Sequence, residues 1–166
     1  LARRKIVNGH AIGRLGQELN VYASSGISDD RECVTKEELL SRLRVGMRVL
    51  VREGSTERNV DALISGALEL GCSTDNLCFC TDDTHAGEIM EEGHINYNVR
   101  RAIELGMAPM QAIQMATINA ARHFRMDDEI GSITPGRLAD ILLIDDLTKM
   151  EPKAVYFEGQ LVARSK

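Results

Sequence analysis

The first 124 residues alternate between two kinds of hydrophobic pattern. Short apolar runs predict β-strands at 5–8, 47–52 and 76–80, and a further short strand or turn at 26–32. Stretches with apolar residues on one helical face predict helices at 17–24, 35–45, 59–70, 87–91, 95–105 and 110–124. A strand, a loop and a helix therefore repeat four times, which is typical of an α/β protein with a parallel sheet.

The boundaries of two predicted helices carry specific signals. Thr35 is followed three residues later by Glu38, the spacing of a capping box in which each side chain satisfies a backbone N–H of the first turn. Gly46 and Gly71 follow the last apolar positions of the helices at 35–45 and 59–70, where glycine ends a helix readily.

The pattern changes after the helix at 110–124. An apolar run bounded by acidic residues lies at 140–145, and two further runs at 154–157 and 160–163 flank Glu158-Gly159, which predicts a β-hairpin. We therefore predict two parts, an α/β part at 1–130 and a small β part at 131–166.

Composition narrows the class of protein. The formal net charge is −5 and no basic stripe stands out, so we expect no nucleic-acid partner. No apolar run is long enough to span a membrane, and the N-terminal segment lacks the apolar core of a secretion signal, so we expect a cytoplasmic protein with no membrane partner. The four cysteines are then free thiols, and the alternating Cys78-Phe79-Cys80 favours buried packing over a zinc site.

Polar side chains follow the predicted strands where each one ends. His10 follows the first strand and Asp82-Asp83 follow the last, at the edge of the sheet where α/β proteins carry their chemistry. An imidazole and a carboxylate there are candidate metal ligands, and Asp82 is also a candidate general base. Asp83 could equally cap the next helix, and Glu32 could be either a pocket carboxylate or the partner of Arg31 in a surface ion pair.

Three further acidic residues leave the same choice open. Asp29, Asp30 and Glu53 also lie at strand ends and are either pocket carboxylates or structural groups. His123 falls near the end of a helix, where an imidazole suits the helix dipole, and is interpreted as structural. No phosphate-binding glycine motif and no nucleophile elbow occurs in the sequence.

Several segments together resemble bacterial adenine deaminases, members of the amidohydrolase superfamily. Val7-Asn8-Gly9-His10-Ala11 resembles the family's V-D-G-H-A, and Val51-Arg52-Glu53-Gly54-Ser55 resembles its I-R-E-G-S. Further along, Thr81-Asp82-Asp83 resembles T-D-D, Glu92-Gly93-His94-Ile95 resembles E-E-G-H-I, and the segment at 115–121 resembles M-A-T-x-N-P-A. The segment at 131–140 resembles G-x-I-x-P-G-x-x-A-D, where superfamily members leave the barrel for a small β domain.

The resemblance implies a fold and a reaction. The expected fold is strands five to eight of a (β/α)8 TIM-type barrel with their helices at 1–130, followed at 131–166 by part of a small β-sandwich-like domain. The implied activity is the metal-dependent hydrolysis of adenine to hypoxanthine and ammonia. The implied cofactor is a divalent metal, with manganese expected and iron or zinc as alternatives. His10 and Asp82 would bind the metal, Asp82 would move protons, and Arg31, Glu32 and Asp83 would contact the purine.

The sequence also departs from the family pattern. The aligned motif S-D-H-E carries a metal-binding His where this chain has Arg31, and a permanent cation cannot coordinate a metal. Another cyclic amidohydrolase, for example one that uses Arg31 to hold an acidic substrate, and a non-catalytic paralogue therefore stay open.

The extent of the resemblance bears on assembly. The first-strand H-x-H of the superfamily is absent and the chain does not begin with Met, so we expect a C-terminal portion that is inactive alone. Half a barrel would present unpaired strand edges, which predicts a homo-oligomer or association with the rest of the barrel.

Overall fold

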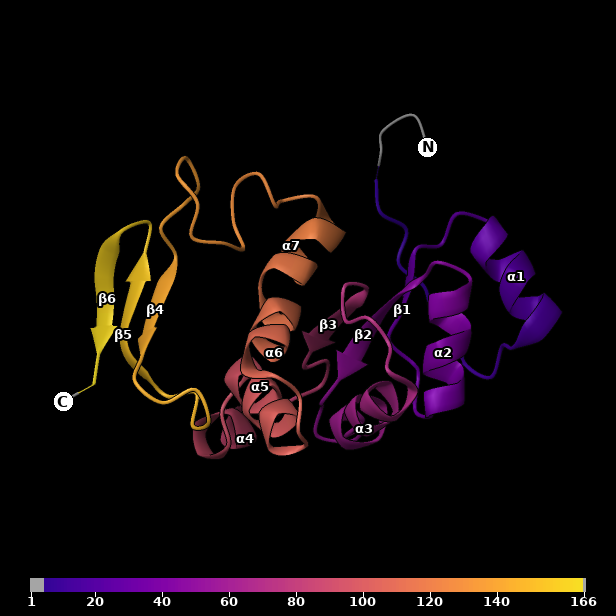
Figure 1. Ribbon diagram of the computed structural model, residues 1–166, viewed down its shortest axis with the longest axis horizontal. Coiled ribbons are helices and arrows are strands. Elements are labelled where there is room, and N and C mark those ends of the chain that lie inside the picture. The colour runs from indigo at the N-terminus through magenta and orange to yellow at the C-terminus, as the bar shows by residue number, and fades with distance from the viewer. Residues whose placement is uncertain (1–4, 166) are drawn as a thin grey trace.

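A parallel sheet forms the centre of the molecule. The computed structural model describes residues 5–165, and its first sheet contains β1 (Asp29–Asp30), β2 (Arg48–Arg52) and β3 (Leu77–Cys80) in that spatial order (Figure 1). Asp30 lies opposite Val49, and Val49 lies opposite Leu77, so the three strands run in the same direction and end at one edge. The predicted parallel α/β arrangement is confirmed for these strands.

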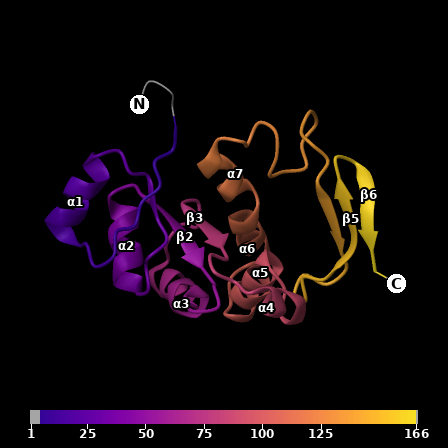
Figure 2. The same cartoon turned by 180° about the vertical axis from the view of Figure 1, so that it is seen from behind.

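Helices cover the sheet. In chain order they are α1 (Gly16–Ser24), α2 (Lys36–Arg44), α3 (Val60–Leu70), α4 (Ala86–Glu91), α5 (Ile95–Glu104), α6 (Pro109–Ala116) and α7 (Ile118–Phe124). Helices α2 and α3 contact β2, whereas α5, α6 and α7 contact β3, as the two views of the ribbon show (Figures 1 and 2). Among residues 5–165, no helix has the length and apolar character needed to cross a membrane.

A second sheet follows the last helix. It is antiparallel, with β4 (Ile141–Ile144), β5 (Pro152–Phe157) and β6 (Gln160–Arg164) in that order, and it lies apart from the first sheet in both views (Figures 1 and 2). Phe157 pairs with Gln160 across the two-residue turn Glu158-Gly159, in which φ is 48° and 79°. Positive φ at both turn residues matches the twist of a hairpin, which confirms the predicted hairpin.

The start of α2 and the end of α3 are formed as the sequence predicts. The Thr35 side chain accepts a hydrogen bond from the Glu38 backbone N–H, and the Glu38 carboxylate accepts one from the Thr35 N–H. Gly71 ends α3 in the left-handed region, with φ of 61° and ψ of 33°.

Two predicted elements differ in the structure. Residues 5–8 do not form a strand; Val7 accepts one backbone hydrogen bond from Ser28, at 3.0 Å, but its side chain is 46% exposed. The predicted helix at 110–124 is divided at Thr117, where φ is −130° and ψ is −95°. The Thr117 hydroxyl donates to the Ile113 carbonyl, a side-chain bond that competes with the backbone ladder of a helix.

The core lies between the first sheet and its helices. Buried apolar side chains of β2 and β3 pack against those of α3, α5 and α6; they include Val49, Val51, Leu77, Phe79, Leu63, Ile64, Val99, Ala112 and Met115. Cys78 on β3 is buried and Cys80 is partly buried, and this burial raises the pKa of the Cys78 thiol to about 11 and that of Cys80 to about 12. Both thiols are therefore protonated at neutral pH, in agreement with a packing role.

A buried ion pair fixes the end of β1. Arg42 Nε donates to Asp30 Oδ2 at 2.9 Å, and neither side chain is exposed. The Arg42 guanidinium also donates to the carbonyls of Ala11 and Arg14, while Asp30 Oδ1 accepts from the backbone N–H groups of Ala11 and Glu32. One pair thus holds α2, β1 and the loop before α1 together.

We expect Arg42→Ala to destabilise the protein that contains this chain by about 3–5 kcal/mol, because it leaves the Asp30 carboxylate buried without its cation. Urea denaturation measures the change. Arg44→Ala on the exposed face of the same helix is the control, with an expected effect within about 0.5 kcal/mol. Equal effects of the two substitutions would contradict the structural importance of the pair.

Gly66 allows α3 to approach α2 closely. A Cβ at Gly66 would lie 2.5 Å from Lys36 Cβ and 3.3 Å from Lys36 Cα, so we expect Gly66→Ala to destabilise by about 1–3 kcal/mol despite alanine's better helix propensity. Gly87→Ala in α4 meets no atom within 4 Å and should stabilise by up to about 1 kcal/mol. Opposite signs in thermal unfolding are the expected result, and stabilisation by both would contradict it.

Candidate functional site

Side chains from all three parallel strands meet at the edge where the strands end. Arg52 is the last residue of β2, while Glu32 and Asp82 lie two residues beyond the ends of β1 and β3. One Arg52 nitrogen, Nη1, lies 3.0 Å from Glu32 Oε2 and 3.2 Å from Asp82 Oδ2. The Arg52 side chain is only 9% exposed, so these ion pairs are partly shielded from water.

Two further side chains join this group. His10 Nδ1 lies 3.0 Å from Glu32 Oε1. Arg31 Nε lies 3.7 Å from Glu32 Oε1 and 3.8 Å from Asp82 Oδ1, and within the described chain this buried atom has no hydrogen-bond partner. We refer to the five residues as the strand-edge cluster, which comprises His10, Arg31, Glu32, Arg52 and Asp82.

The backbone at Asp82 is held in an uncommon conformation. Its φ is 55°, in the left-handed region that residues other than glycine enter at some cost, although Asp tolerates it better than most. The Thr84 hydroxyl lies 2.9 Å from the Thr81 carbonyl and 3.1 Å from the Glu53 carbonyl, which fixes the loop between β3 and α4. Such local strain is common where a side chain has to be presented to a site.

Asp83 lies apart from the strand-edge cluster. Its carboxylate accepts hydrogen bonds from the hydroxyl and the backbone N–H of Thr56. The Thr56 hydroxyl holds the pKa of Asp83 below its ordinary value. A Cβ on Gly54 would collide with the Asp83 carboxylate, so the glycine makes room for this contact. The structure therefore holds Asp83, in the loop after β3, against the loop after β2, and its predicted contact with substrate stays a prediction.

The other acidic strand ends are structural. Asp30 belongs to the buried pair with Arg42, and Asp29 is also buried. The Asp29 Oδ2 atom lies 2.7 Å from Nε2 of His123, which joins β1 to α7. The interpretation of His123 as structural agrees with this position.

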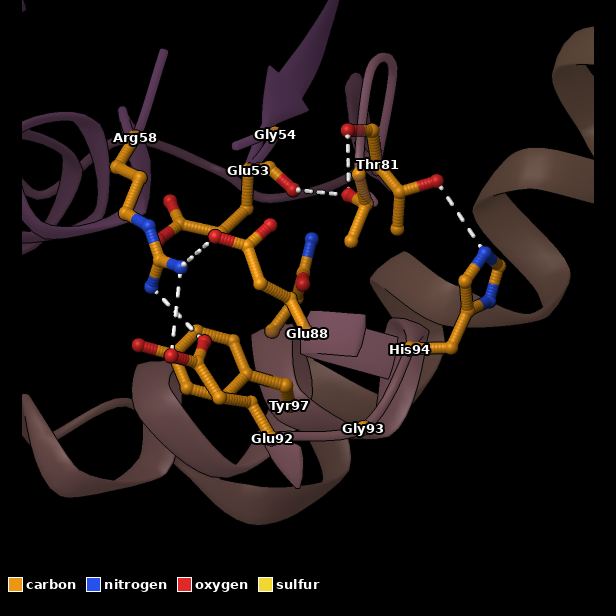
Figure 3. A pocket seen from close by; sticks show the side chains of 11 residues that line it. Glu53, Gly54, Arg58, Thr81, Glu88, Glu92, Gly93, His94 and Tyr97 are labelled. Carbon is orange, nitrogen blue, oxygen red and sulfur yellow. Dashed lines mark hydrogen bonds and ion pairs between the residues drawn. The ribbon is translucent and has the colours of Figure 1, made fainter. Parts of the chain in front are cut away.

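A small pocket lies beside the cluster, between the ends of β2 and β3 and helices α4 and α5 (Figure 3). Glu53, Arg58, Thr81, Glu88, Glu92, His94 and Tyr97 are among its lining residues. His94 Nε2 lies 3.3 Å from the Thr81 hydroxyl, so this histidine faces the pocket. Arg58 pairs with Glu88 at 3.3 Å and with Glu92 at 2.9 Å on the opposite side.

Glu53, which lines this pocket, is a buried acid. One carboxylate oxygen accepts a hydrogen bond from the Val60 N–H at 3.0 Å, in the first turn of α3. Burial raises the pKa of Glu53, and the Val60 N–H and the Arg58 charge oppose this rise only in part. Glu53 is thus a buried acid that caps a helix.

The cluster does not form a metal site from this chain's residues alone. In residues 5–165, no three His, Cys, Asp or Glu side chains converge in a way that could hold an ion. The predicted ligands are engaged otherwise, since His10 contacts Glu32 and both Asp82 oxygens face guanidinium groups. The predicted ligand set of His10 and Asp82 therefore does not fit a metal without further donors and a rearrangement of the arginines.

Sequence reasoning assigned no functional role to Arg52, which lies between the two carboxylates. The available signal was its place as the last residue of an alternating strand, where the carboxyl edge of the sheet begins. An arginine is usually solvent-exposed at such a position, and only the register of three strands shows that it is enclosed.

The chain is similar to known amidohydrolases in both sequence and structure. The model of the Amidohydrolase family matches residues 2–162. An adenine deaminase of Desulforamulus reducens is 57% identical over 98% of this chain and 28% of its own length, and one of Desulfitobacterium hafniense is 43% identical over 100% and 29%. The chain thus spans less than a third of these relatives. A crystal structure of an amidohydrolase aligns over 99% of this chain and 46% of its own, with a TM-score of 0.69 and 18% identity.

We expect Glu53→Gln to reduce the pH dependence of stability. A carboxyl group whose folded pKa is raised contributes stability below its unfolded pKa, about 4.3, and this contribution is lost as the pH rises through the folded pKa. Glutamine keeps the acceptor for Val60 but cannot ionise. Thermal unfolding between about pH 4 and about pH 7 should show a smaller decline for Glu53→Gln than for the parent or the exposed control Glu57→Gln. An unchanged decline would contradict the assignment.

Proposed function

Because the chain belongs to the amidohydrolase family, we propose that the protein containing it hydrolyses adenine to hypoxanthine and ammonia. The observation that carries this proposal is the 57% identity to a protein named adenine deaminase over nearly the whole chain. The chain covers 28% of that relative, so the activity is proposed for the whole protein and not for these residues alone. A cytoplasmic location is part of the proposal, and the four free thiols support it.

The family match and the structural similarity indicate an α/β amidohydrolase fold. We propose that residues 1–130 contain strands five to eight of a (β/α)8 barrel with their helices. Three parallel strands with their helices support this assignment, and the segment at 5–8 lies beside β1 through its bond to Ser28. The separate antiparallel sheet supports a small β-sandwich-like domain at 131–166. The unpaired outer edges of the first sheet would then be covered by the rest of the barrel or by a second copy.

Hydrolytic deamination needs groups that hold a purine and move protons. Adenine presents ring nitrogens that accept hydrogen bonds and an amino group that donates them. The guanidinium of Arg31 and the carboxylate of Glu32 offer complementary donors and acceptors at the strand edge, and Asp83 lies in the loop after β3. Asp82 is the group we assign to proton transfer, because it joins both arginines at the mouth of the sheet and remains 29% exposed.

The amidohydrolase family generally uses a divalent metal. For the whole protein we propose manganese, bound mainly by donors outside this chain. Because the described residues do not fit an ion by themselves, no catalytic step of this chain is assigned through the metal.

A second candidate function has one observation in its favour. Two guanidinium groups at one strand edge, Arg31 and Arg52, would suit a cyclic amide that carries an acidic group. Ammonia release from a panel of purines and cyclic ureides, acidic ones included, separates this candidate from adenine deamination.

We expect the full-length protein to release ammonia from adenine, and Asp82→Asn to lower kcat by about 10²- to 10⁴-fold, the usual contribution of a proton-transfer group. The exposed Asp61, which pairs with Arg101 on the outer helices, provides the control Asp61→Asn with unchanged kcat. Steady-state kinetics across pH should also show a changed profile for Asp82→Asn only. Ammonia release from a cyclic ureide but not from adenine would replace the proposed substrate, and release from none would support a non-catalytic paralogue.

A further inference from the structure

The strand-edge cluster neutralises its own charge. We propose that the guanidinium of Arg31 is an internal cation that takes the place of a divalent metal ion between Glu32 and Asp82 and closes this edge of the sheet to such ions. The proposal concerns the same strand edge as the proposed function, but it depends on ion binding and not on the identity of the substrate.

Each carboxylate oxygen of the cluster faces a basic side chain within 4 Å. Glu32 Oε1 faces His10 at 3.0 Å and Arg31 at 3.7 Å, and Glu32 Oε2 faces Arg52 at 3.0 Å. Asp82 Oδ1 faces Arg31 at 3.8 Å, and Asp82 Oδ2 faces Arg52 at 3.2 Å. A metal ion would have to displace a guanidinium from at least one carboxylate before it could coordinate.

The charge balance opposes this displacement. Two arginines and two carboxylates sum to zero when His10 is neutral, so the cluster has no negative charge left to attract a divalent ion. Arginine cannot lose its proton at accessible pH, so it cannot yield its charge as a lysine or histidine can. An added ion would meet two fixed positive charges in a partly enclosed site, where their repulsion is weakly screened.

The two arginines are not equivalent in this arrangement. Arg52 is 9% exposed and also contacts Asn59 and Glu57, so it belongs to the framework of β2 and α3. Arg31 is 40% exposed, and its Nε lies near two carboxylates without a hydrogen bond. Replacement of Arg31 therefore removes a charge from the cluster, and it breaks no hydrogen bond of Arg31 Nε.

Arg58 offers a matched control. Its side chain is 39% exposed and pairs with the two carboxylates Glu88 and Glu92, but it lies outside the cluster, in the neighbouring pocket. Arg58→His therefore makes the same chemical change beside two carboxylates, without His10 and Asp82.

Metal content of the full-length protein tests the inference without turnover. The protein is incubated with manganese, desalted and analysed by elemental mass spectrometry. We expect Asp82→Asn to leave the manganese content of the otherwise unchanged protein as it is. Arg31→His should add about one ion per chain, because an imidazole replaces a cation beside the carboxylates, and Asp82→Asn in that background should remove it. Arg58→His should add none.

Two outcomes would overturn the proposal. One is the loss of an ion when Asp82→Asn is introduced into the protein with Arg31 in place, since Asp82 would then be a ligand despite the arginines. The other is a folded Arg31→His variant that gains no ion. The first measurement needs no change at Arg31, so it tests the proposal even if the Arg31→His variant misfolds. Both readouts are independent of whether adenine is the substrate.

Discussion

The buried pair of Asp30 and Arg42 is the interaction on which the geometry of the strand edge depends. Both side chains are fully enclosed, so the pair owes its stability to complete hydrogen bonding and not to attraction alone. Asp30 accepts the backbone N–H groups of Ala11 and Glu32, the neighbours of His10 and Arg31 in the sequence. The pair thus holds Ala11 against Asp30, which lies 19 residues later in the sequence, and the His10 imidazole lies 3.0 Å from the Glu32 carboxylate.

A second constraint is the parallel register of the three strands. Because β1, β2 and β3 run in one direction, the residues that follow them gather at one edge, and Arg52 lies between carboxylates from both neighbours. The enclosure of Arg52 makes its charge a fixed part of the edge. The left-handed backbone of Asp82 then turns its carboxylate into the same group, so strain in one loop is balanced by two ion pairs.

Sequence reasoning succeeded where the determining forces are local. The capping box of Thr35 and Glu38, the end of α3 at Gly71 and the hairpin at Glu158-Gly159 each depend on residues within a few positions of one another. It failed where distant contacts decide. Residues 5–8 have a strand-like pattern, but they make only one backbone bond to Ser28, and Thr117 divides a continuous apolar helix pattern. Arg52 was missed as a site residue because its burial results from the pairing of three strands.

The charge arrangement limits what this strand edge can contribute to hydrolysis. A guanidinium donates hydrogen bonds and stabilises negative charge, but it does not lower the pKa of a bound water as a coordinated metal does. Arg31 and Arg52 are therefore suited to orienting a substrate and balancing the charge of Asp82, and not to activating water. The two proposals agree on this division: the chain supplies proton transfer and substrate contacts, and Arg31 keeps the ion away from the carboxylates it neutralises. In a hydrolase built this way, substrate contacts and water activation would depend on different segments of the polypeptide.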